Sequence, residues 1–335
     1  MAASFARNYL KVGQYIDPRK FSLVNNRINQ FCLNKRFQQA KIQHLFDEMV
    51  ACDDPQNMRT FKALGTNWPL IQTGQMGLED VIMDERQRGN PARGFYCQTT
   101  SYRFESNPIV GRHMIAFPLF EVEHLGGYKI LHNFQRDLLI DLGYEPESDG
   151  EFPRADYADL LKEFGVDKLE NEHEAKLGEK YPVFSIDNFP TDETYWNMKL
   201  SDKPGFSLKT DVIIGGVETI GSAERSCDVD QMHDEFYNTA GGEYAEVVNE
   251  KLGKERMEKR LNKYLYEGPD GLKREFIERS GMGIGICRLI DDMDKRGLID
   301  RLEQLEKERL EKEKKEKLTP QSKGKKLTPQ SKGKS

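Results

Sequence analysis

The sequence predicts an α+β fold in which helices cover a mainly antiparallel sheet. Three features indicate this class. Residues 95–123 contain a strand, a polar loop and a second strand, residues 208–226 contain two apolar strand segments around a glycine bend, and residues 281–290 contain a small-residue strand that runs directly into a helix. Strands joined by short turns pair antiparallel, and amphipathic segments elsewhere supply the covering helices.

The first half of the chain alternates helical and strand patterns. Residues 21–51 have the apolar spacing of one or two amphipathic helices interrupted near Asn34, and CDDP at residues 52–55 is typical of a turn. In the hairpin, the segment FPLFEVE alternates so that one strand face carries Phe117, Leu119, Glu121 and Glu123.

The second half repeats this mixture. Helical spacing is expected in residues 126–143, 157–164 and 243–263, and YPVFSIDNF at residues 181–189 predicts a strand. Apolar positions in residues 286–316 suit a helix that becomes a Glu/Lys run.

The charge is divided between an acidic body and a basic tail. The net charge is -6, and residues 301–335 hold 12 Lys or Arg and 6 Glu, so the tail carries +6 and residues 1–300 carry -12. The nine-residue unit KLTPQSKGK occurs twice in the last 19 residues and is expected to be disordered. The tail is interpreted as a solubilising extension, with docking on RNA or an acidic partner as the alternative.

Composition excludes several classes of protein. No apolar run approaches the roughly 18 residues of a spanning helix, and the first 20 residues lack a secretory signal, so a cytoplasmic protein without membrane contact is expected. Five widely spaced cysteines without a CxxC pair indicate reduced thiols rather than a disulfide framework or zinc site. No GxSxG, HExxH or GxxxxGK[ST] motif occurs.

Three clusters carry residues suited to chemistry. In the first, Arg103 and Glu105 precede the hairpin loop, and Arg112 and His113 follow it. A guanidinium can bind a phosphate and a carboxylate bidentately, and a carboxylate can accept a hydrogen bond from an adenine amino group. The alternative is a surface salt bridge across the strands.

The second cluster places Asp211 and Glu218 at opposite ends of the apolar sequence around IIGGV, with Arg225 seven residues further on. Carboxylates are uncommon in such runs unless they are paired or bind a metal, and Mg²⁺ held by two carboxylates and substrate phosphates would meet that need. Structurally, Asp211 could instead cap a turn while Glu218 pairs with Arg225.

The third cluster is GMGIGICRLI, with Gly283, Gly285 and Arg288. Glycines at alternate strand positions leave one face flat, so a planar base could approach it and the arginine could stack on that base or reach a phosphate. Tight packing against a helix is the alternative.

Taken in chain order, these segments resemble the three signature motifs of class II aminoacyl-tRNA synthetases, most closely the aspartyl/asparaginyl branch. SYRFESNPIVGRHMIAFPLFEVEH is similar to motif 2, TDVIIGGVETIGSAER to the metal-binding strand, and GMGIGICRLI to motif 3. The resemblance covers residues 20–300. It implies a ligase that uses ATP and Mg²⁺ to activate an amino acid as its adenylate, with ATP and the amino acid as small-molecule partners.

The resemblance also implies roles for individual residues. The catalytic pair is Arg103, on the α-phosphate and the amino-acid carboxylate, and Arg288. The implied ATP-binding set is Arg103, Glu105, Arg112, His113, Phe117, Gly283, Gly285 and Arg288. The implied metal ligands are Asp211 and Glu218, and the implied amino-acid-binding residues are Gln75 and Arg225. Arg225 would pair with a side-chain carboxylate, which favours aspartate.

Two departures from the family pattern bear on the reaction. Leu78 stands where the branch has a lysine that reads aspartate, and the 20 residues before the core are too few for an anticodon-binding barrel. A bare core resembles the ammonia-dependent asparagine synthetases, so asparagine formation from aspartate and ammonia is the leading hypothesis. The alternatives are a minimal tRNA ligase and an inactive paralogue that binds adenylate.

The expected organisation is an N-terminal extension at residues 1–20, a catalytic domain at residues 21–300 and a charged helix end with a basic repeat tail at residues 301–335. The resemblance also implies a homodimer.

Overall fold

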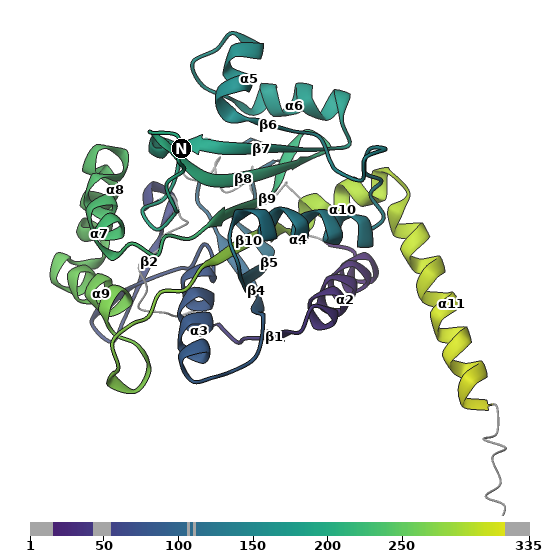
Figure 1. The fold of residues 1–335 in the computed structure, drawn as a ribbon, viewed down its shortest axis with the longest axis horizontal. Helices are drawn as coiled ribbons and strands as arrows, with labels where there is room; N and C mark the ends of the chain where they lie inside the picture. The colour runs from purple at the N-terminus through teal and green to yellow at the C-terminus, as the bar shows by residue number, and fades with distance from the viewer. Residues whose placement is uncertain (1–15, 43–54, 106–107, 110–111, 319–335) are drawn as a thin grey trace, which may run out of the picture.

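The structure is a computed structural model and describes residues 16–42, 55–105, 108–109 and 112–318. An eight-stranded sheet lies at its centre (Figure 1). Its strands, in spatial order, are β1 (Phe37–Gln39), β4 (Gly94–Tyr102), β5 (Ala116–Leu125), β10 (Arg279–Gly285), β9 (Val217–Glu224), β8 (Phe206–Ile214), β7 (Val183–Pro190) and β6 (Arg154–Asp156). The pairs at the two edges are parallel and the inner pairs are antiparallel, which confirms the predicted α+β class.

Helices cover both faces of this sheet. The helices are α2 (Pro18–Asn34), α3 (Gln75–Gln87), α4 (Tyr128–Asp141), α5 (Tyr157–Phe164), α6 (Asn171–Lys180), α7 (Val229–Asn238), α8 (Glu243–Leu252), α9 (Lys254–Tyr266), α10 (Ile286–Lys295) and α11 (Leu298–Leu318). A separate hairpin pairs β2 (Thr60–Ala63) with β3 (Thr66–Pro69). Figure 1 shows α7, α8 and α9 gathered on one side, α5 and α6 beyond β6 and β7, and α11 leading away from the body.

Most of the predicted elements agree with this arrangement. The helical stretch expected at residues 21–51 ends at Asn34 with α2, and the described residues that follow form strand β1 rather than a second helix. The hairpin, the strand pair around Gly215 and Gly216, the strand at residues 181–189 and the strand running into a helix at residues 281–290 are all confirmed. Gly253 and Gly297 adopt positive φ angles of 96° and 71°, so each of the last two helical stretches is two helices rather than one.

Three helices, α3, α6 and α7, were not predicted. Parts of the turn at residues 52–55 and of the hairpin loop, and nearly all of the repeat tail, lie outside the described residues. Among the described residues, no helix combines the length and apolar character needed to cross a bilayer. The four described cysteines carry free thiols.

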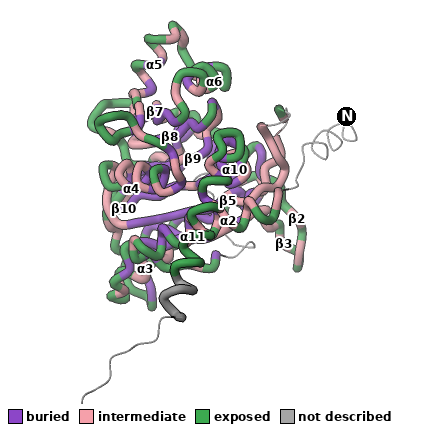
Figure 2. Tube along the Cα trace, turned by 90° about the vertical axis from the view of Figure 1, so that its right-hand side faces the viewer, coloured by how far each residue is buried: buried purple, intermediate pink, exposed green. Residues whose placement is uncertain are grey.

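The central strands are buried by helices, as Figure 2 shows, while the outer turns of α5 and α6 are exposed. One core joins the even-numbered strand residues to α2, α4, α10 and the start of α11; these include Phe120, Val122, Ile220, Met282 and Ile284. Ile299 and Leu302 enter the same core, so α11 crosses the boundary expected at residue 300. The odd-numbered residues of β5 and β10 face the opposite way, where a site can form.

His124 is a buried, neutral histidine in the first core. Its side chain lies against Phe37 and Phe134, its Nδ1 donates to the main-chain oxygen of Leu125 at 3.2 Å, and burial lowers its pKa to about 4. The unfolded chain binds a proton near pH 6.5 and the folded chain does not, so stability is unaffected above that pH and falls on acidification.

We therefore expect His124 to cost about 3 kcal/mol of folding free energy as the pH falls from 6.5 to 4. His124→Phe should remove this acid-dependent loss, whereas His233→Asn, at a partly exposed position, should not. Urea unfolding at a series of pH values measures the effect. Parallel stability curves for the wild type and His124→Phe would contradict it.

Candidate active site

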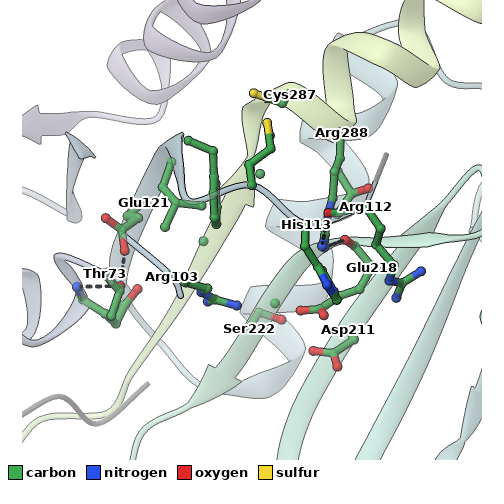
Figure 3. A pocket seen from close by; sticks show the side chains of 18 of the residues that line it. Thr73, Arg103, Arg112, His113, Glu121, Asp211, Glu218, Ser222, Cys287 and Arg288 are labelled. Atoms are coloured by element: carbon green, nitrogen blue, oxygen red, sulfur yellow. Dashed lines mark hydrogen bonds between the residues drawn. The ribbon is translucent and has the colours of Figure 1, made fainter. Parts of the chain in front are cut away.

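A cavity of about 360 Å³ lies on the sheet face opposite the first core. All twelve residues singled out from the sequence line it: Gln75, Arg103, Glu105, Arg112, His113, Phe117, Asp211, Glu218, Arg225, Gly283, Gly285 and Arg288. Figure 3 shows Thr73 and Glu121 on one side, Arg112, Glu218 and Arg288 on the other, and Arg103 between them.

Strand alternation explains why residues so far apart in the sequence meet here. On β5, Phe117, Leu119 and Glu121 face the cavity while Phe120 and Val122 enter the core. The same period of two places Gly283 and Gly285 of β10 on the cavity side.

The motif around Arg103 lies just beyond the end of β4. The Arg103 guanidinium carbon is 5.8 Å from the centroid of the Phe117 ring, a cation–π contact. Glu105 accepts a hydrogen bond from the Asn57 amide at 2.8 Å. Both charged side chains line the cavity.

Two arginines, Arg112 and Arg288, lie at the other side of the cavity from Thr73 and Glu121. Arg112 Nη2 is 2.7 Å from Glu174 Oε2, and Arg288 donates to the main-chain oxygens of Glu218 and, at 3.3 Å, of Arg112. Burial lowers the pKa of His113, so its imidazole is neutral at pH 7. These side chains can bind a polyanion at this end of the cavity.

Asp211 and Glu218 flank the open face of Gly221. A Cβ built on Gly221 would lie 3.0 Å from Glu218 Oε1 and 3.7 Å from Asp211 Oδ1. Burial raises the pKa of Asp211 to about 7, against the lowering influence of Lys209. Burial also opposes ionisation of Glu218, but Lys209, Arg288 and the neighbouring arginines outweigh it and lower its pKa.

The Asp211 and Glu218 oxygens fit a hard divalent cation. Asp211 Oδ1 is buried and accepts no hydrogen bond within the described part of the chain. Across the same residues, no three acidic, histidine or cysteine side chains converge on one point. A Mg²⁺ bound by Asp211 and Glu218 would complete its coordination with water or phosphate oxygens.

Glu121 was not singled out, although the alternation placed it on the correct face. It is fully buried and receives hydrogen bonds from the hydroxyls of Thr73 and Thr99 and, at 2.9 Å, from the Gly74 amide. Burial raises its pKa, and the two hydroxyls partly reverse this shift. Such a carboxylate can bind an ammonium group that enters the cavity.

Arg225 has different neighbours from those considered in the sequence. Its Nε is 3.5 Å from Glu79 and 3.5 Å from Glu123, so pairing with Glu218 is wrong. Gln75 donates to Glu123, and Arg279 lies 2.6 Å from Glu79. The guanidinium at this end of the cavity is therefore already balanced by buried carboxylates.

Three further side chains at or behind the cavity were not predicted from the sequence. Glu174 comes from α6, Lys209 precedes Asp211 by two residues on β8, and Glu79 lies on α3 behind Arg225. The sequence does contain a signal for Lys209. It lies two residues from Asp211 on the same strand face, and a buried lysine needs a carboxylate partner. Leu78 is fully buried in the core around α3 and does not line the cavity.

The fold is shared with solved synthetase structures. Asparaginyl-tRNA synthetase from Pyrococcus horikoshii, complexed with asparaginyl-adenylate, matches with a TM-score of 0.63 and 19% identity over 86% of this chain and 65% of that one. The asparaginyl-tRNA synthetase from Entamoeba histolytica, in complex with asparaginyl-adenylate, matches with a TM-score of 0.64 and 16% identity over 84% of this chain and 65% of that one. A putative aspartyl-tRNA synthetase from Leishmania major Friedlin matches with a TM-score of 0.61 and 16% identity over 85% of this chain and 63% of that one.

This chain thus spans about 65% of the length of the first two of these synthetases. No curated protein matches the sequence. The family model described as tRNA synthetases class II (D, K and N) matches residues 120–300, which include the second half of β5, strands β8 and β9 and the β10–α10 segment. With more than half of its residues matched by that model, the chain belongs to the class II tRNA synthetase family of the D, K and N type.

Proposed function

We propose that the protein activates an amino acid with ATP and Mg²⁺, and that the amino acid is aspartate captured afterwards by ammonia to give asparagine. The observation that supports this most is the convergence of all twelve expected residues on one cavity, with Arg103 between a polyanion-binding side and Glu121. This arrangement suits in-line attack of a carboxylate on the α-phosphorus.

Each group of cavity residues has a separate role in the proposed reaction. Arg103 holds the α-phosphate and the attacking carboxylate, while Glu105 and Phe117 receive the adenine. Arg112, His113 and Arg288 hold the outer phosphates, and Asp211 and Glu218 would bind Mg²⁺, which neutralises developing charge when present. Glu121 would bind the amino group of the substrate.

Formation of asparagine fixes the direction in which aspartate binds. Its side-chain carboxylate must attack the α-phosphorus and expel pyrophosphate, after which ammonia attacks the acyl carbon and AMP leaves with the bonding electrons. The main-chain carboxylate would then face Arg225. In a tRNA ligase the two carboxylates exchange places, because the main-chain carboxylate is activated.

Incubation with ATP, Mg²⁺, aspartate and ammonium tests the proposal. Asparagine and AMP should form in equal amounts. With hydroxylamine in place of ammonium, the side-chain hydroxamate of aspartate should appear rather than the main-chain hydroxamate. Absence of both asparagine and AMP would overturn the proposal.

A second candidate is a tRNA ligase. The balance of Arg225 by Glu79 and Glu123 favours this candidate with asparagine as substrate, since an uncharged carboxamide adds no net charge to the buried site. Attachment of aspartate or asparagine to tRNA, lost on removal of the repeat tail at residues 317–335, would support it. We expect a homodimer in either case.

Gly283 provides a test of the adenine position. A Cβ at Gly283 would meet only Glu121 Cγ at 3.9 Å, so the folded protein has room for a side chain there. Gly283→Val should leave the melting temperature unchanged but raise the KM for ATP roughly tenfold, because it fills the cavity floor. An unchanged KM would contradict the assignment.

Gly281 is the contrasting position on the same strand face. A Cβ there would overlap the side chains of Glu123 and Gln75. Gly281→Val should therefore lower the melting temperature, in contrast to Gly283→Val.

A further inference from the structure

Lys209 places a positive charge directly on one of the two expected metal ligands. Its Nζ lies 2.7 Å from Asp211 Oδ2, and its side chain is only 16% exposed. The Phe189 ring on β7 covers the ammonium group, with 3.7 Å between Nζ and the ring centroid. Because Lys209 and Asp211 are two residues apart on β8, they share the cavity face.

Cations match the carboxylates at this end of the cavity. The carboxylates of Glu174, Asp211 and Glu218 face Arg112, Lys209 and Arg288. Arg103 adds further positive charge that acts on Glu218. Arg112 pairs with Glu174, Lys209 pairs with Asp211, and Arg288 donates to the main chain of Glu218. A lone divalent ion therefore finds no excess of negative charge, whereas the triphosphate of ATP would supply one.

We propose that Lys209 is a resident cation that keeps divalent metal off Asp211 until nucleotide binds, so that metal enters the site together with ATP. The inference rests on the proposed assignment of Asp211 and Glu218 as metal ligands. Asp211 Oδ1 remains available for a metal, but Oδ2 is occupied by the ammonium, and a bound ion would have to displace or repel that charge.

Mn²⁺ binding to the full chain without nucleotide provides the test, with free Mn²⁺ followed by electron paramagnetic resonance. The wild type should bind Mn²⁺ weakly, and Lys209→Met should bind one Mn²⁺ at least about tenfold more tightly, because the ammonium is gone. Lys209→Arg keeps the charge and should behave as the wild type. Lys209→Met combined with Asp211→Asn should lose the gained site.

Lys199→Met is the matched control, because Lys199 is also an ion-paired lysine, 2.5 Å from Glu224, but does not line the cavity. Lys209→Gln replaces Lys209→Met if the latter fails to fold. The proposal is overturned if removal of the Lys209 charge leaves Mn²⁺ affinity unchanged, if Lys199→Met gains the same affinity, or if the gained site survives Asp211→Asn. These outcomes require no turnover, so they are distinguishable from a failure of amino-acid activation.

Discussion

Replacement of Arg103 by alanine is expected to reduce ATP–pyrophosphate exchange by about 100- to 1,000-fold. Arg103 lies between the two sides of the cavity and beside the Phe117 ring. In the proposed reaction, its guanidinium would neutralise charge on the α-phosphate as the carboxylate attacks. The loss should appear mainly in kcat, because this charge develops in the transition state.

Arg103→Lys should lose most of the same activity, since an ammonium cannot contact phosphate and carboxylate with two parallel hydrogen bonds. Arg86→Ala, at an exposed position on α3, is the matched control and should exchange at the wild-type rate. Arg103→Ala with more than a tenth of the wild-type rate would show that another group activates the α-phosphate.

Replacement of Arg279 by methionine should destabilise the folded protein by about 3 to 5 kcal/mol. Arg279 is fully buried, with its Nη2 2.6 Å from Glu79 and its Nε 3.8 Å from Glu123. Tyr264 also donates to Glu79 at 2.7 Å. Removal of the guanidinium leaves two buried carboxylates beside one arginine, Arg225.

Urea unfolding measures this loss of stability. Combining Arg279→Met with Glu79→Leu should recover part of it, because the double change removes a charge of each sign. Lys162→Met, which breaks a surface pair with Asp159 at 2.8 Å, should change stability by less than about 1 kcal/mol. A loss below about 1 kcal/mol for Arg279→Met would contradict the account of this network.

The sequence predicted the sheet and the cavity residues because both depend on short-range patterns. Alternation in FPLFEVE fixed which face Phe117 and Glu121 occupy, and the glycines of β10 marked the flat floor. The order of the motifs then related the separate strands to one another.

The features that were missed depend on contacts between distant segments. Glu79 and Arg279 are 200 residues apart, and no local pattern shows that α3 places a carboxylate behind Arg225. Helix α6 brings Glu174 to Arg112 across 62 residues. The environment of Lys209 also depends on such contacts, because Phe189 from β7 and Asp211 enclose its ammonium group.

Exchange of labelled pyrophosphate into ATP, measured with each of the twenty amino acids, tests the central claim most directly. Activation of an amino acid predicts Mg²⁺-dependent exchange with aspartate or asparagine, lost in Arg103→Ala, before any acceptor is added. Exchange with none of the twenty amino acids would contradict it and would identify the chain as an inactive relative that binds adenylate or a partner.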